Sequence, residues 1–378
     1  MASVLEIAKK INKDFSDNNL IIKGNIVPEY ERLSTGAFGL DYPLFGGLPL
    51  GRIVTFAGLF HSGKTTAACQ VLGAYQRKFP DKKCVYVDME HCLDLQFQKK
   101  MNGLILDKLI YMSPTHLSGE DVLQTIIELQ QADDIGMIVL DSIPALLPNN
   151  ALEADMTKDT GMRGTIAKPL HKFLIKMSGL VLEKQNIFLM INQVRVSGTT
   201  FTGAPIYAEP GGQAPQYYSS IKVRFGTRTF IKGDKNDASD GEGAKGFRLK
   251  FVITKNKCGS IARGGGFLSY NYEKGFMWLE DLLEIAYKFD FIRRLNNITY
   301  QLINLDTGEV YKDETGKELT GKKKDLEKYI LTNIKFQKEY IAMLNNYISS
   351  HSDTYGDILD ARDTAEINNQ ESVVLQEE

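Results

Sequence analysis

Residues 58–65 of this 378-residue chain read Gly-Leu-Phe-His-Ser-Gly-Lys-Thr, which fits the phosphate-binding pattern G-x-x-x-x-G-K-[ST]. The β-branched stretch 52–57 in front of this run predicts a strand, and residues 66–72 behind it predict a helix. Strand, loop and helix in this order form the context in which the pattern binds phosphates. The run therefore predicts a nucleoside triphosphate site, although it does not indicate what the energy drives.

Different groups of this loop are expected to bind the phosphates of ATP and the Mg²⁺ ion. The two glycines let backbone N–H groups point at the phosphates, and the helix that begins near Lys64 adds its dipole. Lys64 supplies an ammonium for the β- and γ-phosphates, and the Thr65 hydroxyl is placed to ligate the metal. The predicted nucleotide-binding loop comprises Gly58, Leu59, Phe60, His61, Ser62, Gly63, Lys64, Thr65 and the supporting Thr66.

The charge and composition limit the partners of the chain. Its 45 Lys and Arg against 47 Asp and Glu give a formal net charge of −2, so any nucleic-acid binding must come from local loops. The four cysteines show no pairing with histidine, which predicts free thiols and neither disulfides nor zinc. The N-terminus lacks a signal-peptide core and no stretch approaches membrane-spanning length, so we expect a cytoplasmic protein without a membrane partner.

Strand and helix patterns alternate from about residue 31 to residue 271, which implies a mostly parallel, twisted sheet covered on both faces. Strands are predicted at 84–88, 137–141, 187–192, 221–225 and 247–254, and helices at 118–131 and about 165–184.

Smaller parts flank this core. Ser3 and Glu6 form the capping-box pattern of a short amphipathic helix, whose apolar stripe packs either on its own core or on a neighbouring subunit. A long helical pattern runs from about residue 323 to residue 349. The predicted parts are 1–30 (helix and linker), 31–276 (core), 277–351 (small α/β domain) and 352–378 (disordered acidic tail).

Two further strand ends carry carboxylates that suit ATP hydrolysis. Asp141 ends an apolar strand, as expected of a carboxylate that holds Mg²⁺ through water, although alone it could simply cap the next turn. Glu90 follows the strand 84–88, and a glutamate beside the phosphates can orient and deprotonate the attacking water. Without this context, Glu90 reads equally well as a solvated loop residue.

Several motifs in one order are together more specific than the phosphate loop alone. They are Leu33-Ser34-Thr35-Gly36, the run from Gly47 to Val54, Ser62 to Thr66, Asp88-Met89-Glu90-His91-Cys92-Leu93-Asp94, Val139-Leu140-Asp141-Ser142, Asn192-Gln193-Val194-Arg195 and Lys255-Asn256-Lys257. In these motifs the chain resembles the bacterial RecA recombinase family, from near the N-terminal helix to about residue 290. The resemblance implies a RecA-type P-loop ATPase core, an N-terminal polymerisation helix and a small C-terminal α/β domain.

The resemblance also assigns roles at matching positions. Glu90 matches the water-activating glutamate, while Asp94 and Phe97 match residues that contact adenine. Gln193 matches the glutamine that senses the γ-phosphate and signals to a DNA-binding loop. Lys255 and Lys257 match lysines that reach across a filament interface to a neighbour's ATP, although alone they read as a surface turn.

Two polar, glycine-rich segments, 153–164 and 196–212, match the family's two DNA-binding loops. Backbone N–H groups, hydroxyls and a few cations suit sequence-independent contacts to phosphates, although each segment alone also reads as a mobile surface loop. The predicted DNA-binding residues are Lys158, Arg163, Gly164, Arg195, Ser197, Thr199, Phe201, Tyr207, Gly211 and Gly212.

The expected function is therefore a DNA-dependent ATPase that forms head-to-tail helical filaments on single-stranded DNA and pairs it with homologous double-stranded DNA. Two alternatives are a ring-forming motor resembling a replicative helicase and an ATP-gated scaffold that coats DNA. The bulky Phe60-His61 pair, Pro169 and Pro215 depart from the family pattern and suggest a divergent member from a phage or mobile element. The sequence leaves open whether loader proteins or a repressor act as further partners.

Overall fold

The computed structural model describes residues 3–15, 20–21, 30–152, 166–199, 205–231, 243–258 and 264–350. The chain divides into two units, Met1–Glu31 and Arg32–Glu378. Some predicted features lie outside the described residues: Lys158, Arg163 and Gly164 of the first DNA segment, Phe201 of the second, and the tail 352–378.

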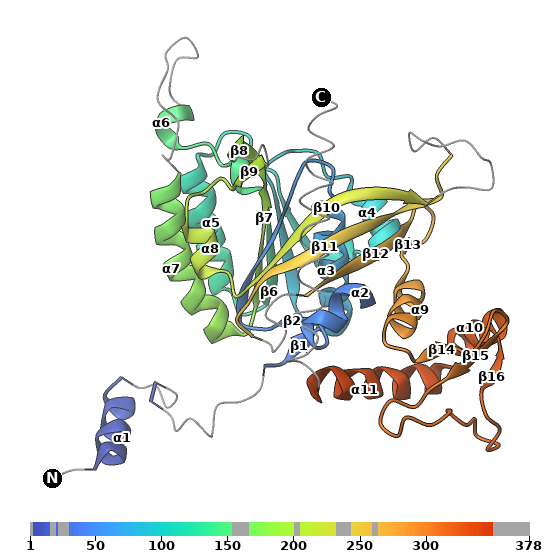
Figure 1. Ribbon diagram of the computed structural model, residues 1–378. Helices are drawn as coiled ribbons and strands as arrows, with labels where there is room; N and C mark the ends of the chain where they lie inside the picture. Colours follow the sequence, from blue (N-terminus) through green and yellow to red (C-terminus); the bar gives the residue numbers. More distant parts are fainter. Residues whose placement is uncertain are drawn as a thin grey trace. The chain divides into compact units, whose positions relative to one another are not determined.

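A nine-stranded sheet in the order β13-β12-β11-β10-β3-β7-β6-β4-β5 forms the centre of the second unit (Figure 1). The neighbours from β10 to β5 pair in parallel, while β11, β12 and β13 extend one edge as antiparallel strands. The predicted α/β fold with a mostly parallel sheet is confirmed. The strands are β3 (Arg52–Gly58), β4 (Lys83–Asp88), β5 (Leu109–Met112), β6 (Ile135–Asp141), β7 (Ile187–Gln193), β10 (Ile221–Ile231), β11 (Gly246–Asn256), β12 (Gly265–Asn271) and β13 (Gly275–Phe276).

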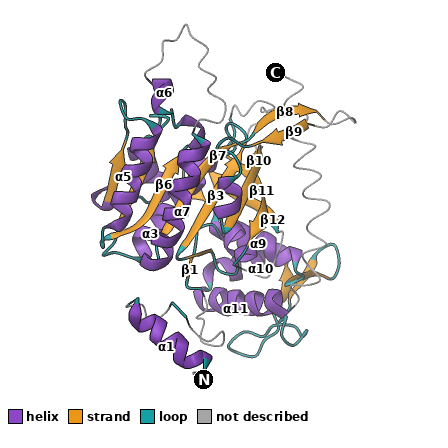
Figure 2. Cartoon of the chain, turned by 90° about the vertical axis from the view of Figure 1, so that its left-hand side faces the viewer, coloured by secondary structure: helices purple, strands orange, loops and turns teal. Residues whose placement is uncertain are grey.

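Helices cover both faces of the sheet because the buried strands are apolar on both sides (Figures 1 and 2). In β4, Tyr86 joins the apolar cluster that contains α3, while its neighbours Val85 and Val87 join the cluster of α5 and α7. This alternation follows from the two-residue period of a strand. The covering helices are α3 (Lys64–Lys78), α4 (Leu95–Asn102), α5 (Gly119–Gln131), α7 (Ala167–Lys184) and the short α8 (Ala214–Tyr218).

Two prolines that depart from the family pattern sit where a helix tolerates them. Pro169 is the third residue of α7, and Pro215 is the second residue of α8. The first N–H groups of a helix have no partner within it, so a proline there removes no intrahelical hydrogen bond. Neither proline interrupts its helix.

The first unit contains the predicted amphipathic helix, α1 (Val4–Asp14). Its capping box is confirmed: the Ser3 N–H donates to Glu6 Oε2 at 2.7 Å, and the Glu6 N–H donates to Ser3 Oγ at 3.3 Å. The apolar side chains of Val4, Ile7 and Phe15 are exposed.

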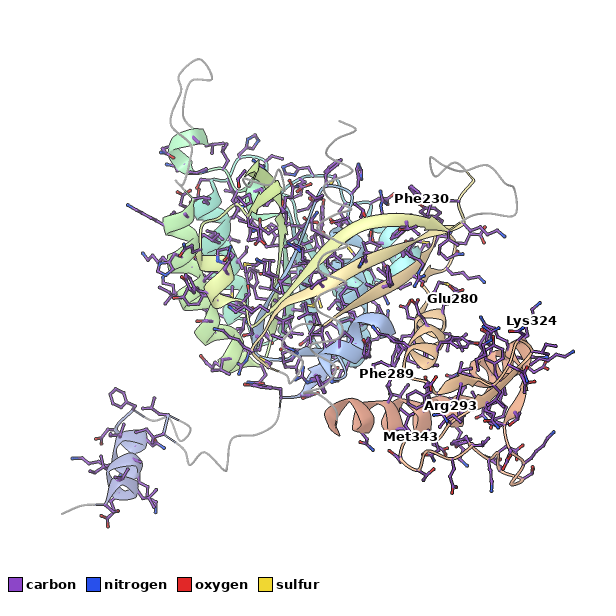
Figure 3. All side chains as sticks on the ribbon, in the orientation of Figure 1. Phe230, Glu280, Phe289, Arg293, Lys324 and Met343 are labelled. Carbon is purple, nitrogen blue, oxygen red and sulfur yellow. The ribbon has the colours of Figure 1, made fainter. Side chains whose placement is uncertain are left out.

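The C-terminal elements share a third apolar cluster with residues from the start of the second unit. Phe38 packs edge-on against Trp278 with ring centroids 5.1 Å apart, and Tyr42 packs against Phe289 at 5.8 Å. Phe289 and Met343, which are labelled in Figure 3, both belong to this cluster. The contributing and nearby elements are β1 (Arg32–Leu33), α2 (Phe38–Asp41), β2 (Leu48–Pro49), α9 (Trp278–Lys288), β14 (Ile292–Arg294), β15 (Thr299–Leu302), β16 (Thr320–Lys322), α10 (Lys323–Thr332) and α11 (Ile334–Ser350).

The prediction of one long helix from about residue 323 to residue 349 is wrong, because one helix ends at Thr332 and a second begins at Ile334. Asn333 has extended backbone angles (φ −101°, ψ 94°) and separates α10 from α11. Its side-chain oxygen accepts the Phe336 N–H at 2.9 Å, as in an N-cap. The asparagine side chain competes with the helical backbone for hydrogen bonds and favours a helix boundary. The apolar pattern continues across this boundary, so the pattern alone predicts one helix where there are two.

Asn333→Ala removes this capping oxygen, and we expect it to lower the free energy of unfolding by about 1 kcal/mol in urea denaturation followed by circular dichroism. Asn333→Ser retains a capping oxygen and is the matched control, with a smaller loss. Equal losses in the two variants would contradict the capping role.

Candidate functional site

The site lies where four parallel strands end at one edge of the sheet. Gly58 at the end of β3 is in register with Gln193 at the end of β7, and Asp88 of β4 is in register with Asp141 of β6. The carboxyl ends of parallel strands are where ligands of open α/β sheets bind. The fold therefore brings together the phosphate loop, two carboxylates and an amide that are distant in the sequence.

The phosphate loop joins β3 to α3, which begins at Lys64. Gly63 has φ 75°, a left-handed angle that favours glycine, and an added Cβ would approach Leu249 Cδ2 to 3.0 Å. Lys64 Nζ donates to the Leu59 carbonyl at 2.6 Å. Burial lowers the pKa of Lys64 to about 8, against the opposing effect of Asp141 and Glu90. The loop therefore holds its cation inside the turn, at the position where phosphates would arrive.

Asp141 is the centre of the predicted metal site. Its Oδ2 accepts hydrogen bonds from Thr65 Oγ1 at 2.7 Å and from the Tyr86 hydroxyl at 2.6 Å. Burial raises the pKa of Asp141, and the two hydroxyl donors oppose that rise. A hydroxyl and a carboxylate in contact are the oxygen ligands that Mg²⁺ prefers, so these residues fit the ion.

Glu90 and Gln193, which the sequence assigns to hydrolysis and to nucleotide sensing, contact each other. Gln193 Nε2 donates to Glu90 Oε1 at 2.9 Å, and Ser142 Oγ donates to the same oxygen at 2.6 Å. Both contacts use Oε1; no hydrogen bond to Oε2 is present among the described residues. This hydrogen bond links Glu90 to the end of β7, after which the chain enters the segment that begins at Arg195.

Asp88 binds the backbone of the turn that contains Glu90, which we call the Glu90 turn, although the sequence predicted no role for Asp88. Its Oδ1 accepts the N–H groups of Glu90 at 3.1 Å and His91 at 2.8 Å. Its Oδ2 accepts the Leu93 N–H at 3.0 Å and the Tyr111 hydroxyl at 2.8 Å. All four partners donate, so both oxygens of Asp88 act as acceptors. Asp88 was visible as a strand-end residue, but its contact with Tyr111 of β5 is not readable from local sequence.

The sequence also predicted no role for Tyr86, which contacts Asp141, or for Ser142, which contacts Glu90. Tyr86 lies two residues before Asp88 in β4, and Ser142 directly follows Asp141. The available signal was only the position of each residue beside a carboxylate at a strand end.

The two residues expected beside adenine lie at the start of α4. Asp94 Oδ1 accepts the Phe97 N–H at 2.9 Å and caps the helix, while the Phe97 ring is exposed. In the phosphate loop, Phe60 is exposed and its ring centroid lies 3.9 Å from that of His61. The bulky pair therefore points away from the core and is tolerated by the loop.

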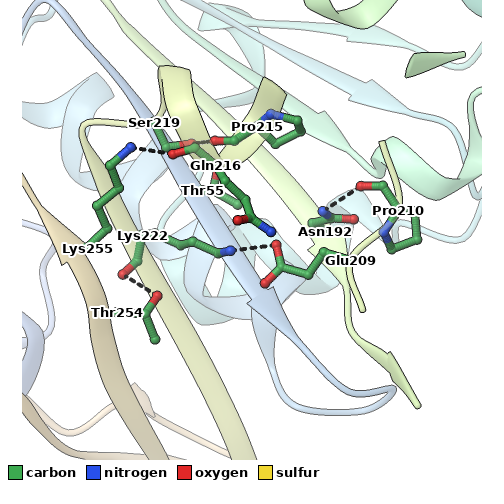
Figure 4. Close-up of polar contacts among 10 residues, drawn as sticks. All are labelled: Thr55, Asn192, Glu209, Pro210, Pro215, Gln216, Ser219, Lys222, Thr254 and Lys255. Atoms are coloured by element: carbon green, nitrogen blue, oxygen red, sulfur yellow. Dashed lines mark hydrogen bonds and ion pairs between the residues drawn. The ribbon is translucent and has the colours of Figure 1, made fainter. Parts of the chain in front are cut away.

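Lys255 and Lys257 contact the end of α8 rather than the phosphate loop. Lys255 Nζ donates to the carbonyl of Gln216 (Figure 4). It also donates to the Tyr217 carbonyl at 3.1 Å, and Lys257 Nζ approaches the same carbonyl at 3.5 Å. Cations are favourable at a helix C-terminus. Burial and the nearby charges of Lys257 and Lys222 lower the pKa of Lys255 to about 8.

The strand register separates these lysines from their own phosphate loop. Lys255 is opposite Lys222, which is opposite Thr55 of β3, whereas the loop leaves β3 at Gly58. Three residues of strand span about 10 Å. The described structure does not bring the two lysines together with Lys64 and Glu90.

Within the second predicted DNA segment, β8 (Arg195–Thr199) pairs antiparallel with β9 (Pro205–Ala208), and the two strands form the β8–β9 hairpin. Ser197, Thr199 and Tyr207 lie on these strands, and Arg195 is exposed at their base. Gly211 and Gly212 follow, with left-handed φ angles of 91° and 72°. A cavity of about 500 Å³, lined by Pro148, Ile166, Arg195 and Gly212 among others, adjoins the described ends of both predicted DNA segments.

No helix among the described residues combines the length and apolarity that a membrane span requires.

The chain is similar to several proteins named Protein RecA. The family model of the RecA N-terminal domain matches residues 3–275, a range that contains the whole site. Protein RecA of Mycoplasma pneumoniae is 31% identical over 302 residues, which cover 76% of this chain and 84% of the relative. Protein RecA of Mycoplasma genitalium is 33% identical over 273 residues (71% and 75%). Protein RecA of Colwellia psychrerythraea is 30% identical over 287 residues (75% and 79%).

Asp88→Asn places an NH₂ group opposite donors, so we expect the Glu90 turn to loosen and ATP turnover to fall at least about tenfold, because small misplacements of reacting groups are costly. Tyr111→Phe removes one donor and leaves the backbone bonds intact, so its turnover is expected to stay within about threefold of wild type. Steady-state phosphate release measures both. Wild-type turnover in Asp88→Asn would contradict the positioning role of the carboxylate.

Proposed function

The chain belongs to the RecA family, and we propose that it is an ATP-dependent DNA recombinase that assembles on single-stranded DNA and pairs it with a homologous duplex. The observation that carries this proposal is the Gln193–Glu90 hydrogen bond of 2.9 Å. This bond joins a residue suited to ATP hydrolysis to the strand that leads directly into the β8–β9 hairpin. A protein that only stored a nucleotide would not need a link between Glu90 and the β8–β9 hairpin.

Residues 58–66, with Asp141, would hold ATP and Mg²⁺. When bound, ATP with Mg²⁺ supplies a phosphoanhydride bond whose cleavage releases free energy. Backbone N–H groups and Lys64 bind and orient the phosphates. Thr65 and Asp141 would ligate the metal, the latter through water, and the exposed Phe97 ring is available to stack on the base.

Glu90 would orient the attacking water and take its proton. Ser142 and Gln193 both hold Oε1, which fixes the carboxylate and leaves Oε2 for the water. Gln193 can exchange Glu90 for a phosphate oxygen as its partner, so its amide has two discrete states. A change of partner at Gln193 moves the start of the hairpin, and in this way the nucleotide state reaches the DNA-binding segment.

Assembly of protomers would complete the site. Lys255 and Lys257 are held at the end of α8, apart from the phosphate loop of their own chain, which suits a role on the nucleotide of a neighbour. The exposed apolar side chains of α1 suit a contact with a further protomer. Heterologous contacts that do not close produce helical filaments.

DNA would be held by segments 153–164 and 196–212. Arg195 is exposed at the base of the hairpin, and the left-handed turn at Gly211 and Gly212 leaves backbone N–H groups free of side-chain bulk. Contacts of this kind recognise the phosphate backbone without reading sequence. Sequence recognition is then left to base pairing between the strands.

The test is strand exchange by the pure protein between a circular single strand and a homologous linear duplex, with ATP and Mg²⁺, alongside electron microscopy. We expect joint molecules, helical filaments and DNA-stimulated phosphate release, all lost in Lys64→Ala. Closed rings with duplex unwinding would overturn the proposal in favour of a ring motor. Filaments without phosphate release or exchange would instead support an ATP-gated coating scaffold.

A further inference from the structure

A largely buried ion pair joins the second DNA segment to the central sheet. Lys222 Nζ lies 2.6 Å from Glu209 Oε2, and the two side chains are only 11% and 13% exposed (Figure 4). Glu209 directly follows β9, and Lys222 is the second residue of β10.

Stability alone does not explain a pair in this position. Removing a lysine and a glutamate from water costs free energy that their attraction only roughly repays, so a buried pair is weak support for stability. What such a pair does provide is a fixed geometry, because leaving either charge without its partner is costly. The pair therefore fixes where the chain returns from the hairpin.

The segment 209–219 is held to four neighbouring strands. At its start, Lys222 of β10 binds Glu209, and Asn192 Nδ2 of β7 donates to the Pro210 carbonyl at 3.0 Å. At its end, Thr55 Oγ1 of β3 and Ser219 Oγ are 2.6 Å apart, and Lys255 of β11 binds the last carbonyls of α8. Asn192 precedes Gln193, so this segment connects the nucleotide sensor to Lys255.

Glu209 also balances a cluster of positive charge. Lys222 and Lys255 are direct cross-strand partners, and Lys257 lies near Lys255 at the end of α8. Like charges directly opposite each other on a sheet are destabilising. The Thr254 hydroxyl contacts the Lys222 carbonyl at 3.4 Å, which further ties the two strands at this point. The carboxylate of Glu209 neutralises one cation and allows the other two to remain together.

We propose that the Glu209–Lys222 ion pair is a positioning element that fixes the returning end of the DNA segment relative to Gln193 and Lys255, and thereby couples DNA affinity to the bound nucleotide. This inference rests on the proposed function. Without the pair, segment 209–219 keeps its contacts at Pro210, Ser219 and α8 but loses the contact that holds Glu209 to β10. DNA binding then responds less to the nucleotide, because movement at Gln193 is no longer passed through a rigid segment.

The decisive variant is Glu209→Gln with Lys222→Met, which removes both charges and leaves neither one buried alone. The measurement is the affinity for a fluorescent oligo-dT strand with a slowly hydrolysed ATP analogue and, separately, with ADP. We expect the ratio of the two dissociation constants to fall at least about fivefold, the low end of typical coupling between sites. The midpoint of thermal unfolding should stay within about 3 °C of wild type, because neutral replacement of a buried pair costs little stability.

Two further variants serve as controls. Lys222→Arg keeps the ion pair and should keep the affinity ratio. Asp133→Asn with Lys184→Met removes another pair with the same 2.6 Å separation, but Asp133 is 94% exposed and lies in the turn before β6. It should leave the ratio within about twofold of wild type, because exposed pairs contribute little.

The outcomes separate the inference from the proposed function. If the wild-type protein binds oligo-dT equally with both nucleotides, the proposed function itself fails. Suppose instead that the wild type binds oligo-dT differently with the two nucleotides, and that the affinity ratio of the neutral double variant stays within about twofold of the wild-type ratio. The inference is then overturned, while the proposed function stands. A fall of more than about 5 °C in the unfolding midpoint, with the affinity ratio intact, would make the pair a stabilising contact and would also overturn the inference.

Discussion

The parallel register of four strands is the constraint on which the whole site depends. Because β3, β4, β6 and β7 run in one direction, Gly58, Asp88, Asp141 and Gln193 all reach the same edge of the sheet. A shift of one residue in any strand would turn these side chains to the opposite face. The apolar clusters on both faces prevent such a shift, so the hydrophobic core sets the geometry of the polar site.

Within this edge, the buried charged side chains are satisfied by hydroxyl and backbone groups. Asp88 accepts four hydrogen bonds, Asp141 accepts two from hydroxyls, and Lys64 donates to a carbonyl of its own loop. A network whose hydrogen bonds are all satisfied is rigid in a low-dielectric site. A change of one partner in it alters the hydrogen bonds of the other members. In the proposed function, Gln193 is the member whose partner changes, and it would pass the nucleotide state to the β8–β9 hairpin.

The sequence predicts the parts of this site that lie in contiguous motifs and not those that depend on distant contacts. The phosphate loop, Asp141, Glu90 and Gln193 are each readable from a strand end and a short motif. The four-bond role of Asp88 and the Glu209–Lys222 pair depend on segments that only the folded sheet brings together. The break at Asn333 was missed for another reason, since apolar periodicity continues through it and only its side-chain cap divides the two helices.

The central claim is that each nucleotide site is completed by the next protomer, and mixing two inactive variants tests it most directly. Lys255→Ala retains Glu90, and Glu90→Gln retains Lys255, so only an interface between the two variants contains both groups. If Lys255 acts on the neighbour's nucleotide, an equal random mixture on single-stranded DNA should recover about one quarter of wild-type phosphate release, as expected for one-way heterologous contacts. Phosphate release no greater than the mean of the two variants alone would contradict the account.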